Sequence, residues 1–414
     1  MRSLFRAPAT LAWAGSLLAV SVASAQTKVP TGPCYDASVR PRVVYVAGSS
    51  AARPFLGVVA KLMAQESPPT TVVYQSQGSC TGVEALYSAN AQKRLIKDIP
   101  EAGATPANYA VYFEADGATV HECFLDPAGN TVDVGISDVY AQSCGLSASA
   151  GVEVTEYLGP VQPMTLVVPA ASSQRTLSAE AGYLIFGLGG HEGAAAPFTD
   201  RRFYFVRNSK SGTQQMVARA VSVPAEKWWG IDRGGSSAIV SAMKLLVDPV
   251  NAEKAIGILS VDVADAERSN MRVLAFQAKD QRCGYWPDSS PTAFDKANVR
   301  EGRYAIWGPL HFFARTSGGV PSEAAGALVS RFAAQRLDPA LVEVVIQKHL
   351  VPQCAMRVTR SSEMGELKPF APEFQCGCYF EAVANGATSC KACGGPGDCP
   401  AERPACNYGY CELN

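Results

Sequence analysis

One pattern recurs up to about residue 350 of this chain: a short β-branched run, a loop rich in Gly, Ser or Asp, and a helical segment. The first unit predicts a strand at 42–46, a loop at 47–51 and a helix at 53–65. Further strands are predicted at 70–74, 133–136 and 203–206. Because strands that alternate with helices pair in largely parallel sheets, the pattern predicts an α/β fold.

The loop after the strand at 203–206 carries the most informative residues. Ligands of open α/β sheets bind outside the carboxyl ends of the strands. A helix predicted to begin near Thr213 offers unpaired N–H groups to an anion, and Gly212 lets the backbone approach it closely. Ser211 and Thr213 add hydroxyl donors, and Arg207 adds a fixed positive charge. This loop therefore predicts an anion-binding site.

Other strand-end loops supply the remaining polar groups of the predicted site. Ser50 and Ser79 bring hydroxyl and N–H groups, whereas Asp138 brings a carboxylate. A carboxylate repels an anion unless the anion has a proton to donate, which phosphate has at neutral pH and sulfate does not. Asp138 therefore predicts selection for a protonated oxyanion.

Taken in order, these loops resemble those of a known family, the phosphate-binding proteins of bacterial high-affinity phosphate ABC transporters. These are type II periplasmic binding proteins. The resemblance spans roughly residues 42–351, with weaker similarity at 255–259 and 298–310. Its main motifs are Val-Ala-Gly-Ser-Ser-Ala at 46–51, Tyr-Gln-Ser-Gln-Gly-Ser-Cys-Thr-Gly-Val at 74–83, Asp-Val-Gly-Ile-Ser-Asp at 133–138 and Arg-x-x-x-Ser-Gly-Thr at 207–213.

The resemblance implies two α/β lobes, each with a central sheet, joined by two hinge strands and closing on inorganic phosphate. It implies a binding protein rather than an enzyme, with no cofactor or metal, and an ABC transporter permease as its partner. The ligand contacts that it implies are Ser50, Ala51, Ser79, Asp138, Arg207, Ser211, Gly212 and Thr213. Ala51 departs from the family, which has Ser or Thr there, so only its backbone N–H is left to bind.

The two ends of the chain predict export and an additional module. Arg2 and Arg6 precede an apolar run at 11–22, and Ala-Ser-Ala at 23–25 suits signal peptidase. A periplasmic, secreted or surface-exposed protein is therefore expected. The predicted divisions are a signal peptide at 1–25, a binding domain at 26–371 with lobe 1 at about 40–155 and 300–371 and lobe 2 at about 156–299, and a cysteine-rich module at 372–414.

Thirteen cysteines in an exported chain predict disulfides, with at least one thiol left over. Seven of them lie within 374–414, so one of these is expected to pair with an upstream residue, Cys354 being the nearest. The spacings Cys376-x-Cys378 and Cys390-x-x-Cys393 leave a zinc site as the less favoured alternative. Cys80 is expected to pair with either Cys123 or Cys144, and the partner of the module is left open.

Composition and motifs leave several other functions to weigh. The formal charge of −1 disfavours a nucleic-acid or anionic-membrane partner. The main alternatives are a binder of sulfate, tungstate, molybdate or a phosphate ester, and a surface interaction protein that retains the binding fold. A serine hydrolase is disfavoured because Ser241-x-x-Lys244 follows Lys210-Ser211-Gly212 in the wrong order and lies in a helical pattern. The Trp228-Trp229 pair is expected to pack beneath a lobe surface.

Overall fold

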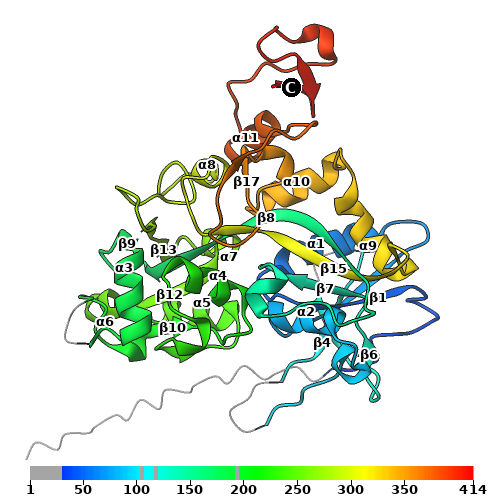
Figure 1. The fold of residues 1–414 in the computed structure, drawn as a ribbon, viewed down its shortest axis with the longest axis horizontal. Coiled ribbons are helices and arrows are strands. Elements are labelled where there is room, and N and C mark those ends of the chain that lie inside the picture. Colours follow the sequence, from blue (N-terminus) through cyan, green and yellow to red (C-terminus); the bar gives the residue numbers. More distant parts are fainter. Residues whose placement is uncertain (1–29, 103–106, 116–119, 192–194, 414) are drawn as a thin grey trace, which may run out of the picture.

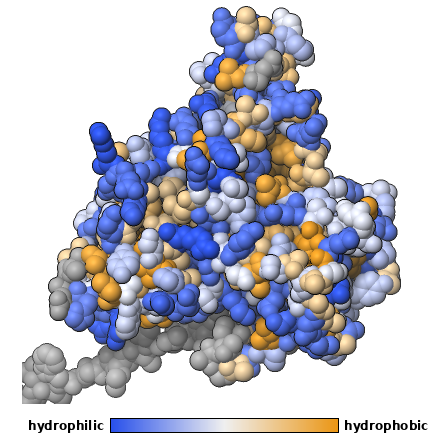
Figure 2. Space-filling view, viewed as in Figure 1, coloured by the Kyte–Doolittle hydropathy of each residue, from blue (hydrophilic) through white to orange (hydrophobic). Residues whose placement is uncertain are grey.

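The protein consists of two α/β lobes side by side, with the C-terminal residues projecting above the junction between them (Figure 1). The computed structural model describes residues 30–102, 107–115, 120–191 and 195–413. The predicted signal peptide lies outside these residues. So does Asp116-Gly117, the turn of a β-hairpin that the flanking segments 110–114 and 119–125 predict. Among the helices of the described residues, none is both long and apolar enough to cross a membrane. Hydrophilic residues cover much of the face seen in Figure 2, with apolar residues scattered among them.

Lobe 1 is built on three parallel strands in the order β2-β1-β7, extended at the β2 edge by an antiparallel hairpin. The hairpin, β4 with β5, is the one predicted from the sequence. Its elements are β1 (Val43–Gly48), α1 (Arg53–Ala64), β2 (Thr71–Ser76), α2 (Ser79–Tyr87), β3 (Leu95–Ile96), β4 (Ala110–Phe113), β5 (Val120–Cys123), β6 (Asn130–Thr131) and β7 (Val134–Ser137), joined by α9 (Glu323–Ala333) and α10 (Pro339–Gln347) from later in the chain.

Lobe 2 repeats the same plan with the strand order β11-β10-β12. Its core combines strand residues with apolar residues of α4 and α5. Its elements are β9 (Thr176–Ser178), α3 (Ala179–Gly182), β10 (Tyr204–Val206), α4 (Gly212–Ala220), β11 (Ile231–Asp232), α5 (Ser236–Lys244), α6 (Pro249–Lys254), β12 (Ile256–Ser260), α7 (Val261–Ala266), β13 (Met271–Val273), β14 (Ala275–Gln277) and α8 (Ala297–Arg300).

Two long strands, β8 (Val154–Pro169) and β15 (Trp307–Ser317), join the lobes. The first half of β8 pairs with β15 beside lobe 1, and its second half pairs with β12 of lobe 2. The apolar run at 163–169 predicts a strand that crosses between the lobes. It lies in β8, of which every residue from Gly159 to Pro169 is buried. Residues 298–310, which predict the second connecting strand, divide between the short helix α8 and the start of β15.

This topology confirms the two-lobe α/β architecture that the resemblance implies, together with a disulfide-rich C-terminal region. The predicted separate sheet in each lobe is wrong, because β8 and β15 join the strands of the two lobes into one continuous sheet. One helix boundary was predicted wrongly. The sequence at 83–87 predicts the beginning of a helix, whereas helix α2 begins at Ser79. Gly78 has a φ of 98°, a conformation open to glycine, and this turn lets the polar residues from Ser79 onward form the first turn of the helix.

Disulfides hold the C-terminal residues together. The elements of this C-terminal region are the hairpin β17 (Val358–Thr359) with β18 (Lys368–Pro369), the helix α11 (Gly377–Asn385) and the hairpin β19 (Ala405–Asn407) with β20 (Tyr410–Glu412). The expected Cys354–Cys376 bond is present, and the four cysteines weighed as a zinc site all lie in disulfides. The bonds of this region are Cys354–Cys376, Cys378–Cys390, Cys393–Cys406 and Cys399–Cys411. Cys283 is the leftover thiol and is exposed.

A buried ion cluster holds in place the segment of lobe 2 that leads into α8. Lys296 is fully buried, and its Nζ lies 2.6 Å from Asp265 Oδ2 and 2.8 Å from Asp288 Oδ1. Arg268 contacts the same two carboxylates at 2.6 and 2.7 Å. Burial raises the pKa of Asp288, whereas Lys296 lowers it. Removing one member of such a cluster leaves an uncompensated buried charge.

We therefore expect Lys296→Met to lower the free energy of unfolding by about 3–5 kcal/mol, because two buried carboxylates lose a cation. Equilibrium denaturation in urea measures this change. Lys279→Met is the matched control, since Lys279 is exposed and its loss should cost less than about 0.5 kcal/mol. Equal midpoints for the two variants would contradict the role given to Lys296.

Candidate functional site

The loops at the carboxyl ends of β1, β7 and β10 meet at the junction of the two lobes. Ser49 follows β1, Asp138 follows β7, and Arg207 follows β10, and all three are buried. Ser79 opens α2 and is buried beside them. In parallel sheets these strand ends lie on one edge, so residues far apart in sequence come together.

Asp138 lies at the centre of this group. Its carboxylate accepts hydrogen bonds from the Ser49 hydroxyl and, at 3.2 Å, from the Ser79 hydroxyl. Burial raises the pKa of Asp138 to about 6, although the two hydroxyls and Arg207 each act to lower it. A carboxylate can accept more than two hydrogen bonds, so Asp138 retains acceptor capacity for a ligand.

Arg207 links lobe 2 to lobe 1. Its Nη2 donates to Ser50 Oγ at 3.0 Å, across the junction. Within lobe 2, Nε donates to the Gly234 carbonyl at 3.0 Å and Nη1 to Ser236 Oγ at 3.3 Å. Burial lowers the pKa of the guanidinium, which stays charged at every physiological pH. The site therefore holds a buried cation, and the three groups to which its guanidinium donates are all neutral.

The amino end of α4 approaches lobe 1 very closely. Ser211 caps the helix, and its hydroxyl accepts the Gln214 N–H at 3.5 Å. Gly212 and Thr213 are buried first-turn residues, so their N–H groups have no partner within the helix. A Cβ on Gly212 would lie 2.3 Å from Ser79 Oγ and 2.7 Å from Asp138 Oδ2. Only glycine fits here, as the sequence predicted from the need for close approach.

The structure brings together Ser50, Ser79, Asp138, Arg207, Ser211, Gly212 and Thr213. Ala51 differs from the expectation. Its N–H, which the resemblance assigns to the ligand, donates to Ser49 Oγ at 3.1 Å. The Ser49 hydroxyl therefore bridges the Ala51 N–H, from which it accepts, and the Asp138 carboxylate, to which it donates.

Sequence reasoning missed a second polar pair beside the site. Gln162, in the crossing part of β8, donates from Nε2 to Asp262 Oδ1 at 3.1 Å and to the Ala51 carbonyl at 3.3 Å. Burial raises the pKa of Asp262 to about 6, and Asp138 adds to this. Two signals point to the pair: a lone Gln within an apolar run, and an Asp just past a strand end, as Asp138 is.

A disulfide stabilises the binding loops. Cys80, the second residue of α2, is bonded to Cys144, which resolves the alternative left open by the sequence. Cys123 pairs with Cys34 instead. Cys80–Cys144 therefore connects the Ser79 loop to the segment that follows Asp138, and so holds these two site residues in register.

The residues weighed for other functions lie away from this group. Ser241 is exposed on α5 and donates to the Ser237 carbonyl at 3.0 Å, while Lys244 pairs with Glu267 at 2.8 Å. Of the two tryptophans, Trp228 stacks on Phe186 as expected. Trp229 does not pack beneath the surface: it is 42% exposed, and the guanidinium of Arg201 lies 4.6 Å from the centre of its ring.

Comparison with known proteins gives remote similarities in structure. No family model and no curated protein matches the sequence. A Clostridium perfringens protein solved with bound phosphate is similar over 75% of this chain and 99% of its own, with 13% identity and a TM-score of 0.49. An ABC-type phosphate transport receptor from Vibrio cholerae is similar over 75% and 99%, with 14% identity and a TM-score of 0.46. Neither similarity identifies a ligand for this protein.

The close approach of α4 predicts the effect of one added methyl group. Gly212→Ala should weaken anion binding at least about 100-fold, because its Cβ would clash with Ser79 and Asp138 and force the lobes apart. Calorimetric titration with phosphate measures the change. Gly326→Ala is the control, since the nearest atom to its Cβ would be 3.7 Å away. Wild-type affinity in Gly212→Ala would contradict the close approach.

Proposed function

We propose that this protein is an exported solute-binding protein that captures inorganic phosphate between its lobes and delivers it to an ABC transporter permease. It binds the ion without converting it chemically. Closure of the lobes replaces the water shell of the ion with donors from both sides. Arg207 and the first N–H groups of α4 supply positive potential, and Ser50, Ser79 and Ser211 supply hydroxyls.

The observation that carries this proposal is the placement of a buried guanidinium and a buried carboxylate in one hydroxyl-lined group. The guanidinium of Arg207 favours an anion, whereas the carboxylate of Asp138 disfavours one without a proton. A hydrogen phosphate satisfies both because it is negatively charged and carries a hydrogen. Sulfate, tungstate and molybdate lack that hydrogen at neutral pH, so Asp138 favours phosphate over these alternatives.

The disulfides support the exported location. Six bonds connect twelve cysteines, and they are distributed over lobe 1 and the C-terminal residues. Such bonds persist in oxidising compartments and are rare where glutathione and thioredoxin keep thiols reduced. An oxidising compartment outside the cytoplasm is also where an exported solute-binding protein meets its ligand.

Titration calorimetry of the mature protein with phosphate, sulfate and tungstate tests the proposal. We expect binding of phosphate and at least about 100-fold weaker binding of the other two, because removal of a hydrogen bond to a buried charged group costs about 3 kcal/mol. Arg207→Ala should abolish phosphate binding. Arg201→Ala, in an exposed arginine of the same lobe, should leave it unchanged. Phosphate binding that survives in Arg207→Ala would remove the proposed site.

The pH dependence of binding follows from Asp138. Because its pKa is raised to about 6, it is ionised and able to accept the hydrogen of phosphate above that pH, and it loses this ability as pH falls through 6. We expect the ratio of phosphate to sulfate affinity to fall as pH is lowered from 8 to about 5. Titrations at each pH measure it.

Asp138→Asn should give a low and nearly constant ratio over the same range. Asp262→Asn is the matched variant, since burial also raises the pKa of Asp262 to about 6 but its observed partner is Gln162. A ratio that changes with pH in Asp138→Asn and becomes constant in Asp262→Asn would transfer the selective role to Asp262.

A further inference from the structure

The hairpin β17–β18 places a buried carboxylate between the two lobes. Glu363, in the hairpin loop, accepts a hydrogen bond from the Tyr140 N–H at 2.7 Å and another from the Ser143 hydroxyl, both in lobe 1. Its side chain is 1% exposed. On the lobe 2 side, Arg219 at the end of α4 lies 3.9 Å from the same carboxylate. Glu363 thus contacts both lobes at once.

The contacts of Glu363 adjoin the candidate site. Tyr140 is two residues from Asp138, and Arg219 is on the helix whose first turn approaches Asp138. The Tyr140 hydroxyl also donates to the Arg360 carbonyl of the hairpin at 2.6 Å. Arg360 in turn donates to the Ala305 carbonyl at 2.9 Å, just before β15. The hairpin therefore touches lobe 1, lobe 2 and the start of a connecting strand.

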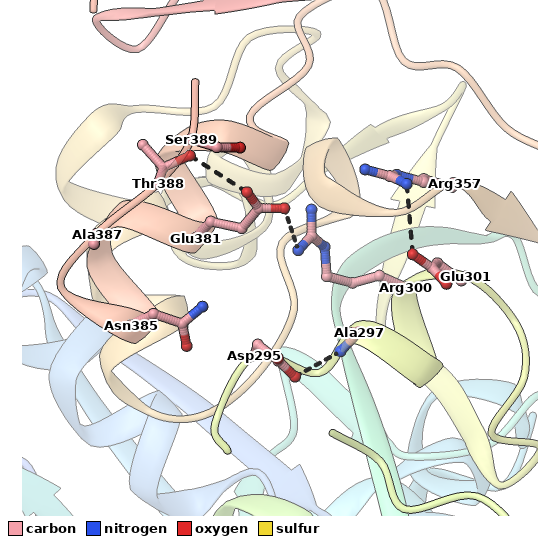
Figure 3. A pocket seen from close by; sticks show the side chains of 10 residues that line it. All are labelled: Asp295, Ala297, Arg300, Glu301, Arg357, Glu381, Asn385, Ala387, Thr388 and Ser389. Carbon is pink, nitrogen blue, oxygen red and sulfur yellow. Dashed lines mark hydrogen bonds and ion pairs between the residues drawn. The ribbon is translucent and has the colours of Figure 1, made fainter. Parts of the chain in front are cut away.

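The C-terminal module holds the hairpin in place. The Cys354–Cys376 bond connects the residues before and after the hairpin. Arg300 of α8 is buried and donates to the Ala355 carbonyl at 3.1 Å and to the Gly377 carbonyl at 3.3 Å, and its Nη1 lies 3.3 Å from Glu381 Oε1. Figure 3 shows Arg300 and Glu381 facing one another where α8 meets the module.

The module also reaches back to lobe 1. The Tyr408 hydroxyl donates to the Leu337 carbonyl at 3.0 Å, in the loop between α9 and α10. The Arg336 guanidinium lies 5.4 Å from the centre of the Tyr408 ring. Figure 1 shows the module above β8 and β15, with α8 on one side of it and α10 on the other.

We propose that the C-terminal region from 352 to 413 is an interlobe brace, and that Glu363 is a positioning residue that keeps the lobes closed. If the lobes separate, Glu363 must leave Tyr140 and Ser143 or leave Arg219. Hydrogen bonds to a buried carboxylate are among the stronger ones, so this separation opposes opening. The consequence for ligand residence rests on the proposed function, whereas the consequence for lobe separation does not.

The first experiment measures lobe separation without any ligand. Spin labels at Cys283, the free cysteine in lobe 2, and at Gln92→Cys, an exposed position in lobe 1, report the interlobe distance by pulsed electron resonance. In Glu363→Gln we expect the distance distribution to broaden toward longer values. Glu366→Gln, an exposed acid on the same loop, should leave the distribution of the parent unchanged.

The second experiment measures dissociation of inorganic phosphate by stopped flow. We expect Glu363→Gln to dissociate about tenfold faster, and Arg219→Gln about two- to threefold faster because its ion pair is longer and partly exposed. Circular dichroism and thermal unfolding confirm that each variant is folded. Arg219→Gln keeps the lobe 1 contacts of Glu363, so it tests the brace even if Glu363→Gln does not fold.

The outcomes separate the brace from the proposed function. Unchanged distance distributions in both Glu363→Gln and Arg219→Gln would overturn the brace, whether or not phosphate binds. If the two variants show broadened distance distributions and the wild-type protein binds no phosphate, the brace is supported and phosphate is rejected as the ligand. Faster dissociation with an unchanged distance distribution would assign Glu363 to the geometry of the Asp138 loop, and would also overturn the brace.

Discussion

A carboxylate buried at the junction of two lobes is the constraint on which the rest of this structure depends. Taking the Asp138 side chain out of water is costly unless hydrogen bonds and opposite charge offset the loss. The Ser49 and Ser79 hydroxyls and the Arg207 guanidinium supply these, and they come from three loops and both lobes. The chain positions of these residues therefore require a fold in which several strand ends meet.

The fold meets this requirement through β8. Because one strand pairs with β15 beside lobe 1 and with β12 of lobe 2, the strands of the two lobes are held at a defined separation within one sheet. Gln162 lies at the middle of that strand and contacts a loop of lobe 1 and an acid of lobe 2. The connection between the lobes is thus a polar part of the site as well as a mechanical one.

The sequence predicted the strand ends well, because β-branched runs and Gly-Ser loops have local causes. It placed Asp138 and Arg207 in the same site, and the close approach of Gly212 followed from its lack of a side chain. It could not predict the role of Ser49 in binding the Ala51 N–H, since that depends on which hydroxyl lies nearer in space. The contacts of Glu363 could not be predicted for the same reason, because its partners are about 140 and 220 residues away in the chain.

The return of the chain to lobe 1 also has a consequence for how this protein acquires its structure. The sheet of lobe 1 begins at Val43 but needs β15, which starts at Trp307, and its core needs α9 and α10 beyond that. Such distant pairings form slowly, because a long stretch of chain must be ordered before they can stabilise anything. Most of the polypeptide must therefore be made before the first lobe is complete. This order suits the proposed export, because a chain whose first lobe is incomplete until β15 has been made can be threaded across a membrane before that lobe folds.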